Sequence, residues 1–543
     1  MQLLLDREVV KDSALVVDAN PTSRSVLTQN LRGMGFANVK QASRIEDARD
    51  MLEHRRFDVV VCDYYFDQSD VNGQDLLEEL RREQLLPYST VFVMVTGEAT
   101  YAKVAEAAEA ALDSYLVKPF SAATLFDRLK EARQRKRVLK DIFEAIEAKD
   151  FEGAADLCLA RFEKHELYWL YAARIGAELL MSLKRNDEAK ALYDAVVAAK
   201  TVPWARLGIA RVQLADGDVT QARRTLEKLI GDAPQFADSY DVLGKVQMEQ
   251  GQLAEATETY KTAATMTPSC ILRLQHAGTL SFYAGESKTA IDMLERTWQL
   301  GSKSRLFDVL SMMLLAFLRF DAHDGKGLVM AEDVIHRFAE QYPQSVRLKR
   351  MANYANALIS LHNGKTAIGI KFAREEIESA LRPDFEMETA TNTLSMWSRL
   401  SRFGVDETEY AAAVRKVASR FSVSKAATEV LVAAVQHQEA ASAWVREAHA
   451  SINRIAEQAM NHAVRGQPKT AVETLLHHGR TTGNAKLIEM AGLVAKRHHE
   501  RIDDIETLKA TATGLAHRYC APSTHIAGVR RSNRSAGGLV LRR

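Results

Sequence analysis

The chain has 543 residues, and its 72 Lys and Arg side chains balance 71 Asp and Glu side chains to a formal net charge of +1. Because one domain holds roughly 100 to 200 residues, this length excludes a single hydrophobic core and predicts several units or a repeat array. The near-neutral charge argues against a chain that binds nucleic acid or a membrane surface along its whole length.

The cysteines and the apolar segments indicate the cellular compartment of the protein. The four cysteines, Cys62, Cys158, Cys270 and Cys520, are far apart and form no CxxC pair, so neither a disulfide framework nor a zinc cluster is predicted. Acids interrupt the apolar run at the start, MQLLLDREVVKD, and no later stretch approaches 18 apolar residues. We therefore expect a cytoplasmic protein without membrane insertion.

The first 130 residues alternate short apolar runs with amphipathic stretches. The expected strands are 14–18, 38–42, 59–63, 91–96 and 114–117. The first expected helix starts at NPTSR, and the others cover 45–54, 73–83, 101–110 and the segment from 121 onward. Five such units predict a parallel, doubly wound α/β sheet.

In a sheet of this kind, functional groups gather beyond the carboxyl ends of the strands. Here the strand ends supply Asp18, Asp63, Thr96 and Lys118. Two acids, a hydroxyl and a lysine suit phosphoryl transfer to a carboxylate, since cations neutralise the phosphoryl oxygens and the hydroxyl hydrogen-bonds one of them. Asp63, which ends the apolar run VVVCD, is the expected nucleophile.

The segments VVDANPTSR, VVVCD, VMVTG and SYLVKPF, in this order and spacing, resemble the receiver domain of two-component response regulators over about residues 12–130. The resemblance implies a flavodoxin-like fold with a five-stranded parallel sheet, a cis Lys118–Pro119 peptide, and phosphorylation by a histidine kinase or phosphotransfer protein. It also implies the following roles: phosphoacceptor Asp63, phosphate-contacting Lys118, switch pair Thr96 and Tyr115, and Mg²⁺ ligands Asp18, Asp63 and the backbone carbonyl of Tyr65.

Two features depart from the family pattern. The first strand ends Asp18-Ala19 where the family usually has two acids, so we expect weakened Mg²⁺ binding, because one or two carboxylates plus water commonly hold this ion. The loop DYYFDQSDVNG, between Asp63 and Gly73, is long and acidic. Either Asp67 or Asp70 replaces the missing ligand, or both simply solvate a surface loop.

A helix is expected to run without interruption from the receiver domain into a linker at 131–150, because no Gly or Pro falls between Arg128 and Asp150. Seven basic residues lie between Arg128 and Lys140. Such a run is usually a solvated helix face, and the alternative is a binding site for nucleic acid or an acidic partner.

A period of 34 residues begins near residue 203. Gly217, Gly251 and Gly285 share it, as do Ala222, Ala256 and Ala290, and Pro234 and Pro268 repeat with the same step. Small residues permit close helix crossings, glycine permits the turn, and proline ends the second helix. The segment AEATETYKTAATMTP resembles the second helix of a tetratricopeptide repeat (TPR).

The resemblance implies an all-α, superhelical TPR-like solenoid over residues 151–304, with the clearest units at 203–236, 237–270 and 271–304. A degenerate helical region is expected at 305–515, and a disordered basic tail at 516–543. Repeats of this kind bind proteins or peptides on the concave face and carry no enzymatic chemistry. By phase, the family's concave positions are Trp204, Leu207, Arg211, Asp238, Asp241, Lys245, Met248 and Glu249, although Trp204 and Leu207 can equally pack against the preceding repeat.

The sequence thus predicts a response regulator, not an enzyme, that is phosphorylated on Asp63 with Mg²⁺ and signals through protein binding by its repeats. Receiver homodimerisation is one route for the signal. The alternative is a constitutive TPR adaptor whose degenerate receiver is never phosphorylated. Nucleic-acid binding through the basic linker and tail ranks last, because the total charge is near neutral.

Overall fold

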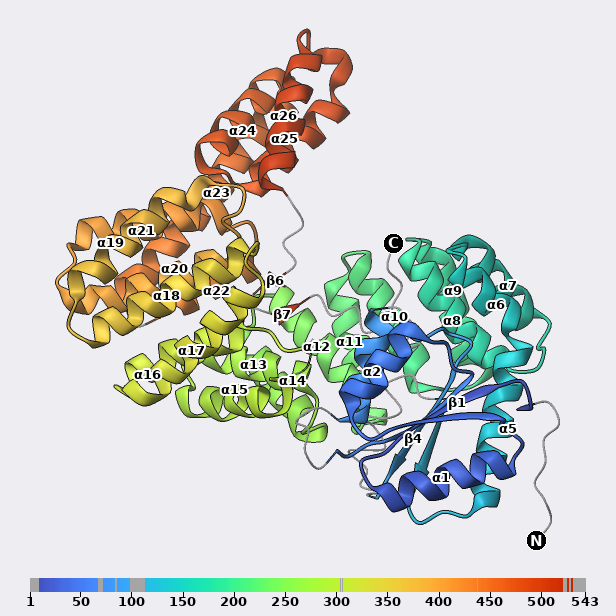
Figure 1. Cartoon of the computed structure of the whole chain (residues 1–543). Coiled ribbons are helices and arrows are strands. Elements are labelled where there is room, and N and C mark those ends of the chain that lie inside the picture. Colours follow the sequence, from blue (N-terminus) through green and yellow to red (C-terminus); the bar gives the residue numbers. More distant parts are fainter. Residues whose placement is uncertain are drawn as a thin grey trace.

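The structure is a computed structural model. It describes residues 9–66, 72–83, 85–97, 113–302, 304, 306–436, 438–520, 525–526 and 529–530. An α/β domain forms the N-terminal part, and the remaining chain is a long array of paired helices that begins beside the sheet and ends in the helices coloured red (Figure 1).

The α/β domain is built on five parallel strands in the order β2-β1-β3-β4-β5, which confirms the predicted sheet. Every residue of the two central strands β3 and β4 is buried. Their continuous runs of apolar residues are what a strand covered on both faces requires. The strand bounds are β1 Ser13–Val17, β2 Asn38–Ala42, β3 Val59–Asp63, β4 Val91–Thr96 and β5 Ser114–Val117.

Helices cover both faces of this sheet. The helices α1 (Pro21–Gly33) and α5 (Ala122–Val138) pack on one face through residues such as Leu31 and Leu129. The helices α2 (Ile45–His54) and α3 (Gly73–Arg82) pack on the other. The helix expected at 101–110 lies outside the described residues.

The expected uninterrupted helix after Arg128 is wrong in one respect, because it breaks at Leu139 between α5 and α6 (Lys140–Glu147). Leu139 has φ −102° and ψ 17°, outside the helical range, and its side chain is fully buried. The break lets Ile142, Phe143 and Ile146 of α6 join the core of the first repeats. Tertiary packing therefore ends α5 at a position where the sequence has no Gly or Pro.

Antiparallel helix pairs with the predicted 34-residue step follow. Gly217, Gly251 and Gly285, with φ of 83°, 73° and 78°, make the turn inside each of the three clearest repeats. A Cβ on Gly244 would lie 2.5 Å from the ring of Tyr260, so only glycine allows that crossing. The pairs are α6 with α7 (Phe151–Glu163), α8 (Trp169–Ser182) with α9 (Asn186–Ala199), α10 (Pro203–Ala215) with α11 (Val219–Asp232), α12 (Ala237–Glu249) with α13 (Leu253–Met266), and α14 (Ile271–Tyr283) with α15 (Ser287–Gly301).

Helical pairing continues through the degenerate region. Its helices are α16 Leu310–Asp321, α17 Gly325–Gln341, α18 Val346–His362, α19 Thr366–Glu378, α20 Met387–Leu400, α21 Glu407–Phe421, α22 Lys425–Ala434, α23 Glu439–Val464, α24 Pro468–Thr482, α25 Ala485–Arg497 and α26 Ile505–Tyr519. Short 3₁₀ turns at Ser379–Leu381, Ser401–Phe403 and His499–Arg501 join some of them.

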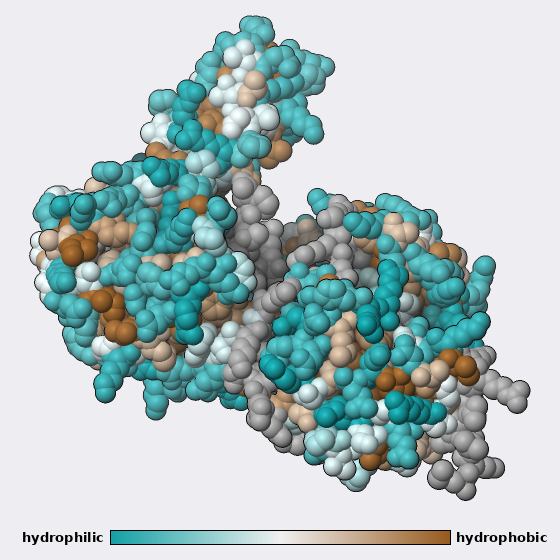
Figure 2. Space-filling view, in the orientation of Figure 1, coloured by the Kyte–Doolittle hydropathy of each residue, from teal (hydrophilic) through white to brown (hydrophobic). Residues whose placement is uncertain are grey.

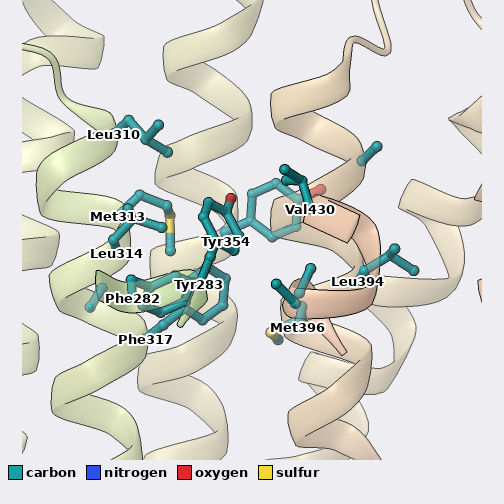
Figure 3. Packing of buried hydrophobic residues seen from close by; sticks show 14 of the residues in the cluster. Phe282, Tyr283, Leu310, Met313, Leu314, Phe317, Tyr354, Leu394, Met396 and Val430 are labelled. Atoms are coloured by element: carbon teal, nitrogen blue, oxygen red, sulfur yellow. The ribbon is translucent and has the colours of Figure 1, made fainter. Parts of the chain in front are cut away.

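The array closes on itself in its middle part, where α22 packs against α12, α13 and α14. One hydrophobic core consequently joins residues from Met248 to Ala448, and Figure 3 shows part of it, with Phe282 and Tyr283 lying near Phe317 and Tyr354. In the same core, Arg399 on α20 contacts α16: its guanidinium lies 4.5 Å from the ring of Phe317 and donates to Asp321 at 2.5 Å.

Within the segment predicted to be a disordered tail, α26 continues to Tyr519, and β6 (His525–Ile526) pairs antiparallel with β7 (Val529–Arg530). Across the described residues, no helix combines the length and hydrophobicity that a bilayer crossing needs. Hydrophilic residues dominate the face drawn in Figure 2, with small apolar patches between them.

Candidate functional site

Three charged side chains meet at the carboxyl edge of the sheet. Asp18 follows β1, Asp63 ends β3, and Lys118 follows β5. The Lys118 Nζ lies 3.0 Å from Asp18 Oδ2 and 3.1 Å from Asp63 Oδ2, so one ammonium bridges two carboxylates. Parallel strands explain the convergence, because their carboxyl ends open at the same edge.

The N-terminal turn of α1 holds Asp18. The backbone N–H of Asn20 donates to Asp18 Oδ1 at 2.8 Å, the Ser23 hydroxyl donates to Oδ2 at 2.5 Å, and Arg24 donates to the Asp18 carbonyl at 2.5 Å. Ser23 and Arg24 were not among the site residues predicted from the sequence. Both residues lie in the helix-start signal NPTSR, but the sequence does not show that their side chains point toward Asp18.

Asp63 is held by its own strand end and by the start of α3. The backbone N–H of Tyr64 donates to Asp63 Oδ1 at 2.9 Å. A Cβ on Gly73 would lie 2.2 Å from the Asp63 carbonyl oxygen and 3.0 Å from Cys62 Sγ. Glycine at this position therefore lets α3 begin directly against the strand that carries Asp63.

Burial and charge set the protonation of the site. Burial raises the pKa of Asp63, Asp18 raises it further, and Lys118 opposes both. Burial alone would lower the pKa of Lys118, but the bonds to Asp18 and Asp63 outweigh burial and raise it. Burial, Asp63 and Asp18 raise the pKa of the Cys62 thiol well above its usual value, so this cysteine stays protonated beneath the site.

The other residues named from the receiver resemblance surround this triad. Thr96 ends β4 and is fully buried, and its neighbour across the ladder is Val117. Tyr115, on β5, is half-buried and packs against the core under α2 and α3. The Lys118–Pro119 peptide is cis. Tyr65 is 38% exposed, two residues beyond Asp63.

A divalent cation has two carboxylates available here, from Asp18 and Asp63. Ala19 packs its methyl group against the apolar core under α2 and α3 and supplies no ligand. No cluster of three His, Cys, Asp or Glu side chains suited to a metal occurs among the described residues. Two carboxylates with backbone and water oxygens still fit Mg²⁺, which is usually bound in this way. Asp67 and Asp70, the proposed replacements, lie outside the described residues.

The first three predicted groove residues make contacts within the chain. The ring of Trp204 meets the ring of Tyr193 edge-on at 6.2 Å, and the Arg174 guanidinium lies 5.9 Å from it. Leu207 is 2% exposed. Arg211 donates to Glu178 on α8 at 2.6 Å. These side chains therefore bind neighbouring repeats to one another.

The groove residues on α12 are similarly engaged. Asp238 and Asp241 both accept hydrogen bonds from the buried guanidinium of Arg273 on α14, at 2.8 Å each. Met248 is buried, Lys245 is half-buried and Glu249 is exposed. Three of the expected groove positions, Arg211, Asp238 and Asp241, are thus paired with charged side chains of adjacent repeats.

Part of the basic run near the linker is also used inside the chain. Arg133 bonds Asp12 at 2.5 Å, and Arg135 and Lys136 lie 3.2 Å and 3.1 Å from Asp113. These three side chains are mostly buried, which leaves fewer free cations for an acidic ligand than the sequence suggests.

Comparison with known proteins agrees with the geometry. Residues 14–130 match the response regulator receiver domain, and residues 180–246 and 237–270 match tetratricopeptide repeats. Chemotaxis protein CheY-3 of Vibrio cholerae is 35% identical over 135 residues, which span 25% of this chain and 99% of that protein. Chemotaxis protein CheY of Pseudomonas aeruginosa is 35% identical over 121 residues, which span 22% of this chain and 95% of that protein.

Among solved structures, the chemotaxis response regulator CheY4 of Vibrio cholerae is 25% identical, and the match covers 22% of this chain and 98% of that chain with a TM-score of 0.21. Through residues 14–130 the chain belongs to the response regulator receiver family, and its receiver domain is followed by tetratricopeptide repeats.

Proposed function

We propose that this chain is a phosphorylation-controlled scaffold, in which Asp63 accepts a phosphoryl group and the helical repeats bind a partner protein. The observation that carries the proposal is the bridge from Lys118 to both Asp18 and Asp63 at the edge of the sheet. A buried pair of acids beside a lysine serves no evident packing purpose, and it suits a group that must receive and stabilise added negative charge.

In the proposed reaction, a carboxylate oxygen of Asp63 attacks phosphorus, the bond from phosphorus to the donor's leaving group breaks, and an acyl phosphate forms. The leaving group is the imidazole of a phosphohistidine or the acetate of acetyl phosphate. Lys118 stays within reach of a phosphoryl oxygen, since its Nζ already lies 3.1 Å from Asp63 Oδ2. Thr96 hydrogen-bonds the new phosphoryl group, and Tyr115 follows its movement.

Asp18, Asp63 and the backbone carbonyl of Tyr65 would hold the Mg²⁺ ion. When bound there, Mg²⁺ neutralises part of the charge on the transferred phosphoryl group. Ser23 and Asn20 keep Asp18 aligned for this role through their bonds to its two oxygens. Ala19 cannot add a third carboxylate, so the affinity is expected to be lower than in a site with two adjacent acids.

The experiment is incubation of the purified chain with acetyl phosphate and Mg²⁺, read by intact mass. We expect a gain of one phosphoryl group that depends on Mg²⁺ and disappears in Asp63→Asn. Asp58→Asn is the matched control, because Asp58 lies just before the same strand, at the opposite edge of the sheet, and its carboxylate bonds Ser13 instead. No mass gain in the wild type, under conditions that label an ordinary receiver, would refute the proposal.

One observation favours a second function, that of a constitutive adaptor. Ala19 takes the position of an acid and packs against the core, and the Lys118 ammonium already pairs with both remaining carboxylates. In that case the receiver only supplies a docking face, and partner binding is the same with and without phosphodonor. Binding that changes upon treatment with acetyl phosphate would exclude this alternative.

A further inference from the structure

The short C-terminal hairpin lies far from the helices that precede it in the sequence. Strand β6 rests against α20 and α22, and β7 rests against α14. Figure 1 shows both strands at the centre of the molecule, well away from the red helices that end at Tyr519. The tail therefore returns to the part of the array where α22 closes onto α12, α13 and α14.

A hairpin this small needs outside support. It consists of two antiparallel pairs, His525 with Arg530 and Ile526 with Val529. An isolated two-stranded hairpin is at best marginally stable in water, even at greater length. The surface formed by α14, α20 and α22 therefore supplies the interactions that maintain it.

That surface differs from an ordinary helical core. Every residue of α20 is buried and all but one of α14, yet both helices are rich in hydroxyl and amide side chains. Ser281 Oγ on α14 and Asn392 Oδ1 on α20 are enclosed without a hydrogen-bond partner among the described residues. Buried polar groups usually find partners. These two atoms lack partners even with β6 and β7 in place, so the support for the hairpin comes from its packing against α14, α20 and α22.

We propose that α14, α20 and α22 form a binding site for an extended peptide, and that its resident occupants are the chain's own strands β6 and β7. A partner that uses this site must first displace the tail, so the tail acts as an internal competitor. The site is separate from the predicted groove on α10 and α12, and the inference does not depend on phosphorylation of Asp63.

The test uses a fluorescent peptide of residues 521–543 and measures its binding by anisotropy to unphosphorylated protein. The proteins compared are the full chain, a chain ending at Cys520, and full-length Ile526→Asp/Val529→Asp. The truncation leaves every helix intact, since α26 ends at Tyr519, and thermal unfolding followed by circular dichroism checks that it folds. Val540→Asp/Leu541→Asp is the matched control, with the same change of charge in the same tail.

We expect saturable binding to the truncated chain and to Ile526→Asp/Val529→Asp, and binding at least tenfold weaker to the full chain and to the matched control. A peptide of the same composition in scrambled order should bind neither form well. The proposal would be overturned by equal binding to all four proteins or by no binding to the folded truncated chain. Equal binding of the scrambled peptide would also overturn it, because it would show only electrostatic attraction of a basic peptide.

Discussion

Asp113 connects the receiver domain to the repeats, and its replacement by Asn should be costly. The carboxylate is fully buried at the start of β5, where it accepts the backbone N–H of Phe92 at 2.9 Å and pairs with Arg135 and Lys136. Lys136 also donates to the carbonyl of Tyr88 at 2.6 Å. Arg135 lies 4.8 Å from the ring of Tyr171 on α8, so the cluster reaches the first repeats.

The magnitude follows from what each cation can do when its anion is lost. Burial lowers the pKa of Lys136 to about 8, so in Asp113→Asn this lysine can deprotonate at pH 7 for roughly 1 kcal/mol. Arg135 loses a charged hydrogen bond worth about 2 kcal/mol. Asn still accepts the Phe92 N–H. We therefore expect Asp113→Asn to lower the free energy of unfolding by about 3 kcal/mol.

Urea unfolding followed by circular dichroism and tryptophan fluorescence measures this loss. Glu144→Gln on α6 is the matched control, since it removes an ion pair with Lys140 whose side chains are 67% and 63% exposed, and such a pair contributes about 0.5 kcal/mol or less. If Asp113→Asn costs no more than Glu144→Gln, the cluster does not hold the two domains together and the reasoning is refuted.

Three further predictions concern packing and protonation. Gly73→Ala should lower stability by about 1–3 kcal/mol and reduce acyl phosphate formation, because the new Cβ would meet the Asp63 carbonyl at 2.2 Å, whereas Gly33→Ala has open space and should leave both unchanged or slightly improved. Gly244→Ala should lower the free energy of unfolding by a similar ~1–3 kcal/mol because the new Cβ clashes with Tyr260, whereas Gly231→Ala should raise it slightly. Chemical denaturation compares the two variants, and equal stabilities would contradict the close helix crossing. Between pH 7 and 9.5, the free energy of unfolding of the wild type should rise by about 1–2 kcal/mol relative to that of Lys136→Met. The reason is that the unfolded state holds the lysine proton up to about pH 10.5, whereas the folded state releases it near pH 8, so stability rises with pH. A difference that does not change with pH would show that the pKa of Lys136 is unperturbed.

Local pattern was sufficient to predict the α/β domain. The strands could be located because β3 and β4 are buried on both faces and consist of almost purely apolar runs. The convergence of Asp18, Asp63 and Lys118 followed from the rule that parallel strands share a carboxyl edge. The positions of Ser23 and Arg24 did not, because they depend on the direction in which α1 leaves β1.

The repeats were predictable in period but not in their contacts. The 34-residue step located the helices, yet the charged positions of the expected groove are paired with the adjacent repeat: Glu178 lies 33 residues before Arg211, and Arg273 lies 32 residues after Asp241. A pattern read within one repeat cannot show such a partner. The closure of α22 onto α14 is even harder to predict from the sequence, because Gln436 donates to the carbonyl of Phe282, 154 residues earlier in the chain.

Hydrogen exchange of the full chain, with Mg²⁺ and with or without acetyl phosphate, tests the scaffold account most directly. Arg135 pairs with Asp113 in the receiver and contacts Tyr171 in the first repeats. Phosphorylation of Asp63 should therefore change amide protection in α5, α6 and α8 as well as around β4 and β5, and Asp63→Asn should abolish both changes. Changes confined to the receiver domain, or identical in Asp63→Asn, would contradict a phosphorylation-controlled scaffold.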